Sequence, residues 1–326
     1  MLCPCDDVAT PAGAQKTGEQ KMKNLIFTIA SSMVAAVALG NNVSAELTSN
    51  DLNIYGDAFS NDVRVVQIVG GVRVIGQNGT LVNGLPSVTF RTGPLVNVTG
   101  LMDSGNDRLA FVAIGNIGDI NMEGGQGDDQ LILTRAAGQG NVTLRGEEGN
   151  DRAVFTDSSA AGDVILDLGI GANVINAQRF TSGFNFEAFG GDLNDNFNIG
   201  ASTVGGSLSL NADKGNDIVN ISNVMTGISA GIFTDEGADR VTVSGLGAGF
   251  DVIVSTGAQN DIVSLTNVSA LANLEVNLDE GNDTLTTSSV SASFDAKAIG
   301  GSGTDRFRNF GFAGGIKTEV LEFELF

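Results

Sequence analysis

The sequence lacks histidine and tryptophan, and it contains only one tyrosine, four prolines and two cysteines among 326 residues. Without histidine, a Ser-His-Asp or Cys-His nucleophile and a histidine-bound zinc or haem are excluded. Basic residues are also few, since 17 Lys and Arg stand against 38 Asp and Glu and the formal net charge is −21. Nucleic-acid binding needs clustered Lys and Arg, so this charge argues against a nucleic-acid partner. A surface of the same sign attracts cations.

Glycine and apolar residues are abundant instead. The chain has 45 Gly, 18 Phe and 42% hydrophobic residues. A strongly negative charge is common in disordered chains, but such chains hold few Val, Ile, Leu and Phe residues. The composition is therefore that of a folded, glycine-rich β protein.

An uncharged segment near the amino terminus predicts export. Residues 25–39 form a run of 15 uncharged residues after Lys23, and Val43-Ser44-Ala45 fits a small-residue cleavage site. The run is short for a membrane span, which needs about 20 apolar residues. We therefore expect residues 22–45 to be a signal peptide, residues 1–21 to be an upstream extension or a mis-assigned start, and the mature chain to have no transmembrane span. The expected location is secreted or extracytoplasmic, in the periplasm or at the cell surface.

A repeat of 22 residues fills the rest of the chain. An acidic, glycine-rich turn recurs with this period, and its last Asp falls at 107, 129, 151, 195, 217, 239, 261, 283 and 305, with Asn at 173. The residues two and four positions after this Asp are mostly apolar, and those between them are mostly polar. Such alternation indicates a half-buried strand. A second alternating segment precedes each turn, and a further apolar position after the first strand predicts a third short strand.

One unit of 22 residues cannot bury its own apolar face, but stacked units can. We therefore predict an all-β fold, a parallel β-solenoid with about 22 residues per coil, right-handed because parallel crossovers usually are. Residues 46–95 are expected to form irregular amino-terminal coils and a cap. Residues 96–315 would form ten regular coils, and residues 316–326 would cap the open strand edge at the carboxyl end.

Two of the turns have a more specific pattern. Residues 300–308 read GGSGTDRFR and residues 124–132 read GGQGDDQLI, while residues 190–198, GGDLNDNFN, lack one glycine of the same pattern. These segments resemble the nonapeptide GGxGxDxUx of the hemolysin-type (RTX) calcium-binding repeats, where U is a large apolar residue. The resemblance is to a degenerate form with one motif per coil, whereas family members run their motifs in tandem. It implies that backbone carbonyls and the motif Asp hold Ca²⁺ between adjacent turns.

The acidic residues themselves point to a cation. Stacked carboxylates about 5 Å apart repel by about 3–4 kcal/mol per pair at an effective dielectric constant near 20. Carboxylates beside carbonyl-rich turns suit Ca²⁺, whereas in the alternative each Asp accepts a hydrogen bond within its own turn. The candidate calcium ligands are Asp103, Asp107, Asp129, Asp151, Asp195, Asp213, Asp217, Asp235, Asp239, Asp261, Asp279, Asp283 and Asp305.

These features together predict a secreted, non-catalytic β-solenoid that binds Ca²⁺ weakly. Its expected role is structural or adhesive, with calcium ions and cell-surface or matrix components as partners. The acids recur alike in nearly every coil, whereas a catalytic site is a singular constellation in a cleft. Two alternatives stay open: a β-helix enzyme acting on polysaccharides as a lyase or hydrolase, and a purely structural solenoid without an ion.

Overall fold

The computed structural model describes residues 41–324, which contain β-strands and turns and no helix. Residues 1–40, with most of the predicted extension and signal peptide, lie outside the described residues. The predicted cleavage site lies within strand β1 (Asn42–Thr48), where Val43 is fully buried and Ala45 is 4% exposed. Cleavage after Ala45 would remove the first four residues of this strand.

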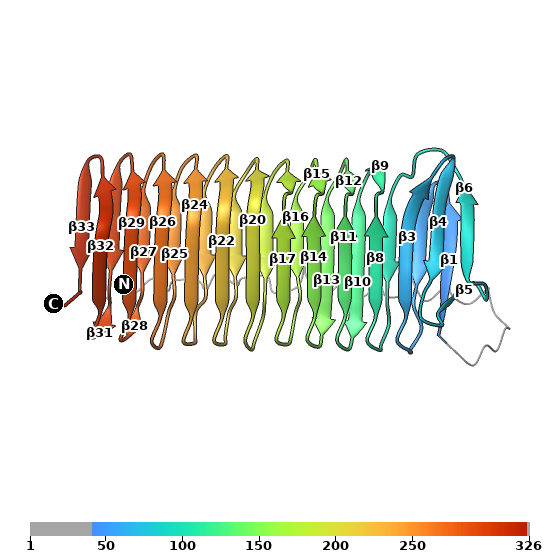
Figure 1. The fold of residues 1–326 in the computed structure, drawn as a ribbon, viewed down its shortest axis with the longest axis horizontal. Helices are drawn as coiled ribbons and strands as arrows, with labels where there is room; N and C mark the ends of the chain where they lie inside the picture. Colours follow the sequence, from blue (N-terminus) through green and yellow to red (C-terminus); the bar gives the residue numbers. More distant parts are fainter. Residues whose placement is uncertain (1–40, 325–326) are drawn as a thin grey trace, which may run out of the picture. The chain divides into compact units, whose positions relative to one another are not determined.

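Nearly all strands belong to two long sheets, which are stacked coil by coil (Figure 1). The fourteen-stranded sheet consists of β1, β2 (Asp51–Tyr55), β5 (Leu81–Val82), β7 (Val98–Leu101), β10 (Ile120–Gln126), β13 (Val142–Glu148), β16 (Val164–Asp167), β19 (Phe186–Phe189), β21 (Leu208–Asn211), β23 (Ala230–Phe233), β25 (Val252–Ser255), β27 (Leu274–Asn277), β30 (Asp295–Ile299) and β33 (Lys317–Leu321).

The seventeen-stranded sheet consists of β3 (Asp62–Ile68), β4 (Gly71–Gly76), β6 (Ser87–Arg91), β8 (Arg108–Val112), β9 (Gly115–Ile117), β11 (Gln130–Thr134), β12 (Ala137–Gly138), β14 (Arg152–Thr156), β15 (Ser159–Ala160), β17 (Val174–Gln178), β18 (Thr181–Ser182), β20 (Asn196–Val204), β22 (Ile218–Thr226), β24 (Arg240–Ala248), β26 (Ile262–Ala270), β29 (Thr284–Ala292) and β32 (Arg306–Gly314). Two short strands, β28 (Glu280–Gly281) and β31 (Ser302–Gly303), pair with each other at the acidic turns.

The register confirms the predicted parallel β-solenoid. In the seventeen-stranded sheet Val219 pairs with Val241, and Val241 pairs with Val263, so each residue lies beside its equivalent 22 positions away. The fourteen-stranded sheet has the same offset, for example between Leu208 and Ala230. Like side chains therefore stack on like, and the inward columns form one continuous apolar core.

Burial follows the alternation that the sequence predicts. Val219, Val241 and Val263 are at most 1% exposed, whereas the outward neighbours Asn220 and Thr242 are half-buried. The expected first and third strand segments remain separate in the early coils, as in β14 and β15. From β20 onward they merge into single strands of nine residues.

The two ends of the solenoid differ from its middle. Residues 42–91 include the antiparallel pairs β1–β2, β3–β4 and β4–β6. At the other end, within the segment expected to be a cap, β33 pairs parallel with β30 and places Val320 beside Ala298. Residues 317–321 thus continue the sheet by one more, largely exposed strand at the same 22-residue offset.

Candidate functional site

The last Asp of each acidic turn lies at the edge of the core, directly before a strand of the seventeen-stranded sheet. We name this column the aspartate ladder. Every member is at most 2% exposed, although carboxylates are rarely buried without a partner. The members are Asp107, Asp129, Asp151, Asn173, Asp195, Asp217, Asp239, Asp261, Asp283 and Asp305.

Hydrogen bonds between coils hold the ladder. The backbone N–H of Asp195 donates to Oδ1 of Asp217 at 2.7 Å, and that of Asp217 donates to Oδ1 of Asp239 at 2.7 Å. The same bond joins every pair of successive members, with distances of 2.6–2.8 Å. The alternative of a bond within each Asp's own turn is therefore wrong for Oδ1. Sequence spacing places these residues in one column but does not give the direction of the side chain.

Both ends of the ladder are also bonded. The backbone N–H of Asn61 donates to Oδ1 of Asp107, and the backbone N–H of Asp305 donates to Oε2 of Glu324. The ladder thus runs without a gap from the amino-terminal coils to the last turn that the structure describes.

The second carboxylate oxygen, Oδ2, is different. Within residues 41–324, Oδ2 of all nine ladder aspartates is buried and accepts no hydrogen bond of good geometry. The side chains of Asn61, Thr234 and Thr256 lie close enough to Asp107, Asp239 and Asp261 to lower the pKa of these three carboxyls. A buried acceptor without a donor costs about 1–3 kcal/mol, and more when it is charged. Nine such atoms in one column are far more than a folded protein leaves unsatisfied by accident.

Burial raises the pKa of the ladder carboxyls, and repulsion between neighbouring acids adds to it. The pKa of Asp195 rises to about 8, and that of Asp129, Asp217 and Asp261 to about 7. Loss of water around the carboxylate is the largest cause at each of these four sites, while the backbone hydrogen bond to Oδ1 lowers the pKa. For Asp107, Asp151, Asp239 and Asp283 burial raises the pKa to about 6.

Asn173 shows what surrounds the position of Oδ2. Its Oδ1 accepts a hydrogen bond from the backbone N–H of Asp151 at 2.7 Å, as the aspartates do. Its Nδ2 donates to the carbonyl oxygens of Gly169 at 3.1 Å and Gly190 at 2.8 Å. By equivalence, Oδ2 of a ladder aspartate would face such carbonyl oxygens, and it would then require a proton or a cation where Asn173 supplies N–H groups.

The first glycine of the GGxGxD pattern makes room for the carboxylate. A Cβ atom on Gly124 would lie 2.4 Å from Oδ2 of Asp129, and a Cβ atom on Gly190 would lie 2.2 Å from Oδ2 of Asp195. Other coils hold a larger residue at the equivalent position, where Ala212, Thr234 and Thr256 precede Asp217, Asp239 and Asp261 by five residues. The ladder bond is kept in those coils as well. The glycine therefore fits the local path of its own coil and is not required by the ladder.

The remaining candidate ligands lie outside the ladder. Asp103, Asp213, Asp235 and Asp279 each precede a ladder residue by four positions and are exposed or half-buried. Their side chains are not buried with the ladder carboxylates. Within residues 41–324 no group of three or more His, Cys, Asp or Glu side chains is close enough together to hold a metal ion. A cation at the ladder would therefore draw most of its ligands from backbone carbonyls, which with carboxylates are the oxygen donors that Ca²⁺ prefers.

Two further polar ladders were not predicted, although they have the same period. Next to the aspartate ladder, Oδ1 of Asn216 accepts the N–H of Ala238 at 2.9 Å, so this bond runs in the opposite direction along the solenoid. At the other edge, Oδ1 of Asp251 accepts the N–H of Asn273 at 2.9 Å. The signal for these ladders in the sequence was Asn or Asp recurring with the 22-residue period at the end of a turn, one or two residues before a strand.

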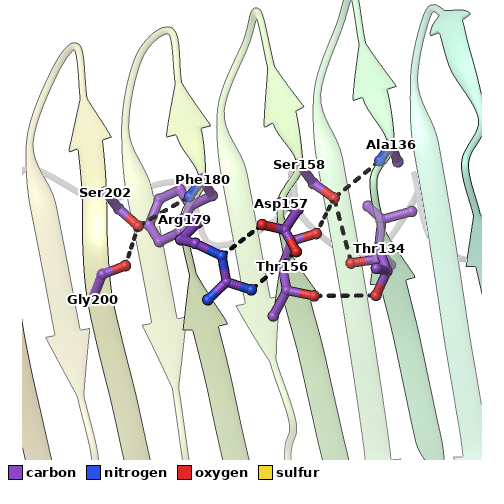
Figure 2. Close-up of polar contacts among 10 residues, drawn as sticks. Thr134, Ala136, Thr156, Asp157, Ser158, Arg179, Phe180, Gly200 and Ser202 are labelled. Atoms are coloured by element: carbon purple, nitrogen blue, oxygen red, sulfur yellow. Dashed lines mark hydrogen bonds and ion pairs between the residues drawn. The ribbon is translucent and has the colours of Figure 1, made fainter.

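Figure 2 shows a polar set on the seventeen-stranded sheet, where the repeat departs from its apolar pattern. Ser158 and Ser202 occupy a core column and are each 5% exposed. Their Oγ atoms accept the backbone N–H groups of Ala136 and Phe180, both at 3.1 Å. The small serines flank Phe180, whose ring stacks on Phe186 with centroids 4.6 Å apart. These residues join coils and form no cleft.

An exposed ion pair lies beside this set. Nε of Arg179 is 2.6 Å from Oδ1 of Asp157, which lies one coil earlier. The hydrogen bond from Arg179 lowers the pKa of Asp157. Because both side chains are largely exposed, we assign the pair a small contribution to stability.

No helix in residues 41–324 is long and apolar enough to cross a membrane. Comparison of the chain with protein-family models, with curated proteins and with solved structures finds no match.

Proposed function

We propose that the protein is an exported, non-catalytic β-solenoid whose aspartate ladder binds Ca²⁺ weakly and whose surface has a structural or adhesive role. The observation that carries this proposal is the column of nine buried Oδ2 atoms without a partner. The hydrogen bonds of Asn173 support it, because they place carbonyl oxygens around the same position. A bound Ca²⁺ would supply positive charge to the ladder carboxylates and offset their repulsion.

The residues that would hold the ion are the ladder aspartates, through Oδ2, together with turn carbonyls. Protons compete for the same oxygens, because burial raises the pKa of these carboxyls to about 6–8. We therefore expect calcium binding to strengthen as pH rises from 5 to 8. Affinities in the range of about 10⁻⁴–10⁻³ M suit a protein outside the cell.

Repetition of the acidic residues supports a non-catalytic role. Each ladder carboxylate accepts a hydrogen bond from the backbone N–H one coil earlier, and each is buried to nearly the same extent as its neighbours. A general acid and base need two carboxyls whose environments differ, and they need access to substrate. The segment at residues 22–45 supports export and a place at the cell surface or in a matrix.

Thermal unfolding in Ca²⁺ and in chelator, at constant ionic strength near pH 8, tests the proposal. Each independent site adds about 1.4 kcal/mol at a Ca²⁺ concentration ten times its dissociation constant, so several sites should raise the Tm by many degrees. Mg²⁺ should substitute poorly, because it requires a tight octahedron. An equal Tm in Ca²⁺ and chelator would contradict calcium binding.

A pair of variants assigns the effect to the ladder. Asp217→Asn with Asp239→Asn should reduce the calcium response and raise the Tm in chelator. The matched control, Asp167→Asn with Glu187→Gln, removes the same charge from half-buried residues on the fourteen-stranded sheet. It should leave the calcium response intact, and loss of the response in both variants would indicate nonspecific charge screening.

A further inference from the structure

Exposed apolar side chains follow the turns at the edge opposite the aspartate ladder. In Figure 1 the acidic turns lie along the lower edge with β28 and β31, and these other turns lie along the upper edge. We name the row the apolar ridge, and each of its side chains is 50–74% exposed. The ridge consists of Phe184, Ile228, Phe250, Leu271, Phe294 and Ile316.

Backbone hydrogen bonds fix the ridge in register from coil to coil. The N–H of Phe250 donates to the carbonyl of Ile228 at 2.7 Å, and the N–H of Ile316 donates to the carbonyl of Phe294 at 2.9 Å. Between them, Ala272 occupies the same column, with Leu271 directly before it. Ala272 is only 2% exposed although it lies in an edge turn. The backbone of the ridge turns is therefore ordered at about 4.8 Å per coil. The row of side chains is interrupted once, where Gly206 separates Phe184 from Ile228.

The area of the ridge is that of an interface. Aromatic side chains have about 150–250 Å² of surface each and Ile and Leu have somewhat less, so six such side chains that are 50–74% exposed present about 600 Å². This value lies at the upper end of the apolar patches on ordinary monomers. Two copies meeting through it would bury about 1,200 Å², the lower bound for specific, stable complexes.

Charge distinguishes the two edges of the solenoid over the same coils. The ridge turns contain two aspartates and one lysine, and the acidic turns contain twelve acidic residues and one lysine. The ridge turns are residues 183–185, 205–207, 227–229, 249–251, 271–273, 293–295 and 315–317, and the acidic turns are residues 191–195, 213–217, 235–239, 257–261, 279–283 and 301–305.

This distribution of charge indicates which kind of partner can bind the ridge. A peripheral lipid surface is usually bound by apolar side chains together with Lys and Arg, and Lys317 is the one basic residue in these turns. A second copy needs no such cations. Packing ridge against ridge would place the two acidic edges on opposite outer sides, where their repulsion is weakest.

We propose that the apolar ridge is a self-association surface, at which a second copy of this chain packs its own ridge in a twofold-symmetric dimer. The ridge turns keep the same backbone register from coil to coil, so the row can pack against its own copy, as a twofold interface requires. The inference goes beyond the proposed function and does not depend on calcium.

Sedimentation velocity of the full chain in chelator, over a hundredfold concentration range, tests the proposal. We expect a dimer in which Phe250→Ser with Phe294→Ser weakens self-association at least tenfold. The control, Leu193→Ser with Ile262→Ser, removes side chains that are 56% and 41% exposed near the acidic edge and should remain dimeric. Circular dichroism establishes that both variants are folded. If the first variant does not fold, Ile228→Ser with Ile316→Ser replaces it with the same expectation.

Three results would overturn the proposal. The first is a wild-type chain that stays monomeric throughout the concentration range, and the second is a folded ridge variant that dimerises as well as the control. The third is a monomeric chain that cosediments with phosphatidylcholine vesicles through the ridge, which would make lipid the occupant. None of these outcomes bears on calcium binding, which the thermal unfolding experiment tests separately.

Discussion

Replacing Asp217 with Asn should stabilise the chelator-treated protein near pH 8 and have much less effect near pH 4.5. Burial raises the pKa of this carboxyl from 3.8 to about 7, and the charges of Asp239 and Asp213 contribute. Because the folded-state pKa exceeds the unfolded value, the folded protein binds the proton more tightly. The contribution of the Asp217 carboxyl to stability is therefore largest below about pH 4, and it is lost as pH rises toward 7.

The shift gives the size of the effect. About three pKa units at 1.36 kcal/mol each correspond to about 4 kcal/mol between acidic and mildly alkaline pH. The Asn side chain escapes this loss, since its amide can donate to the carbonyls as Asn173 does. Up to about 4 kcal/mol is large beside the 5–15 kcal/mol of a typical domain.

Urea unfolding at the two pH values, with chelator present, measures this difference. The control Asp192→Asn removes an exposed carboxylate in a neighbouring turn and tests for a general charge effect. Equal stabilisation by Asp217→Asn at both pH values, or none at either, would refute the argument from buried ionisation. Equal stabilisation by the control would show that the lower net charge of the protein, and not burial of the Asp217 carboxylate, causes the effect.

Three further predictions concern the core, the turns and catalysis. Val219→Asp, Val241→Asp and Val263→Asp should each be severely destabilising in denaturant melts, whereas Asn220→Asp and Thr242→Asp should be tolerated, and equal effects would overturn the assigned faces. Gly190→Ala should cost about 1 kcal/mol or less, because Ala212 holds the equivalent position before Asp217 and the ladder bond is kept there, while Gly93→Ala, with no atom near its Cβ position, should be neutral in the same assay. A screen on acidic polysaccharides should show no turnover, and cleavage that is lost on changing one carboxylate pair would place the protein among enzymes.

Much of the fold follows from the sequence because the period is strict. A 22-residue repeat of Val, Ile, Leu and Phe defines which side chains stack, and it predicted the partners of Val219 and Val241. The continuation of the sheet by β33 was not predicted, because its residues lack the acidic turn that marks the other coils. The apolar ridge was not predicted either, since Phe250 and Phe294 recur with the same period as core residues and periodicity alone does not separate turn from core.

The candidate site was predicted in position but not in geometry. The Asp column identified the ladder residues, and the structure places all of them in one buried row. Which oxygen meets a backbone N–H, and from which coil, depends on side-chain rotamers that spacing does not determine. The outer acids Asp213, Asp235 and Asp279 share the turns with the ladder, yet they remain outside the buried row because they precede the point at which the chain enters the core.

The most direct test of the account is a crystal structure of the protein grown near pH 8 in millimolar Ca²⁺, with anomalous scattering used to locate the ions. The account predicts Ca²⁺ beside Oδ2 of the ladder aspartates and no ion beside Asn173, where the amide already occupies the carbonyl-lined position. Ladder carboxyls without metal, with Oδ2 within hydrogen-bond distance of backbone carbonyls, would contradict calcium binding and identify the ladder as a row of protonated acids.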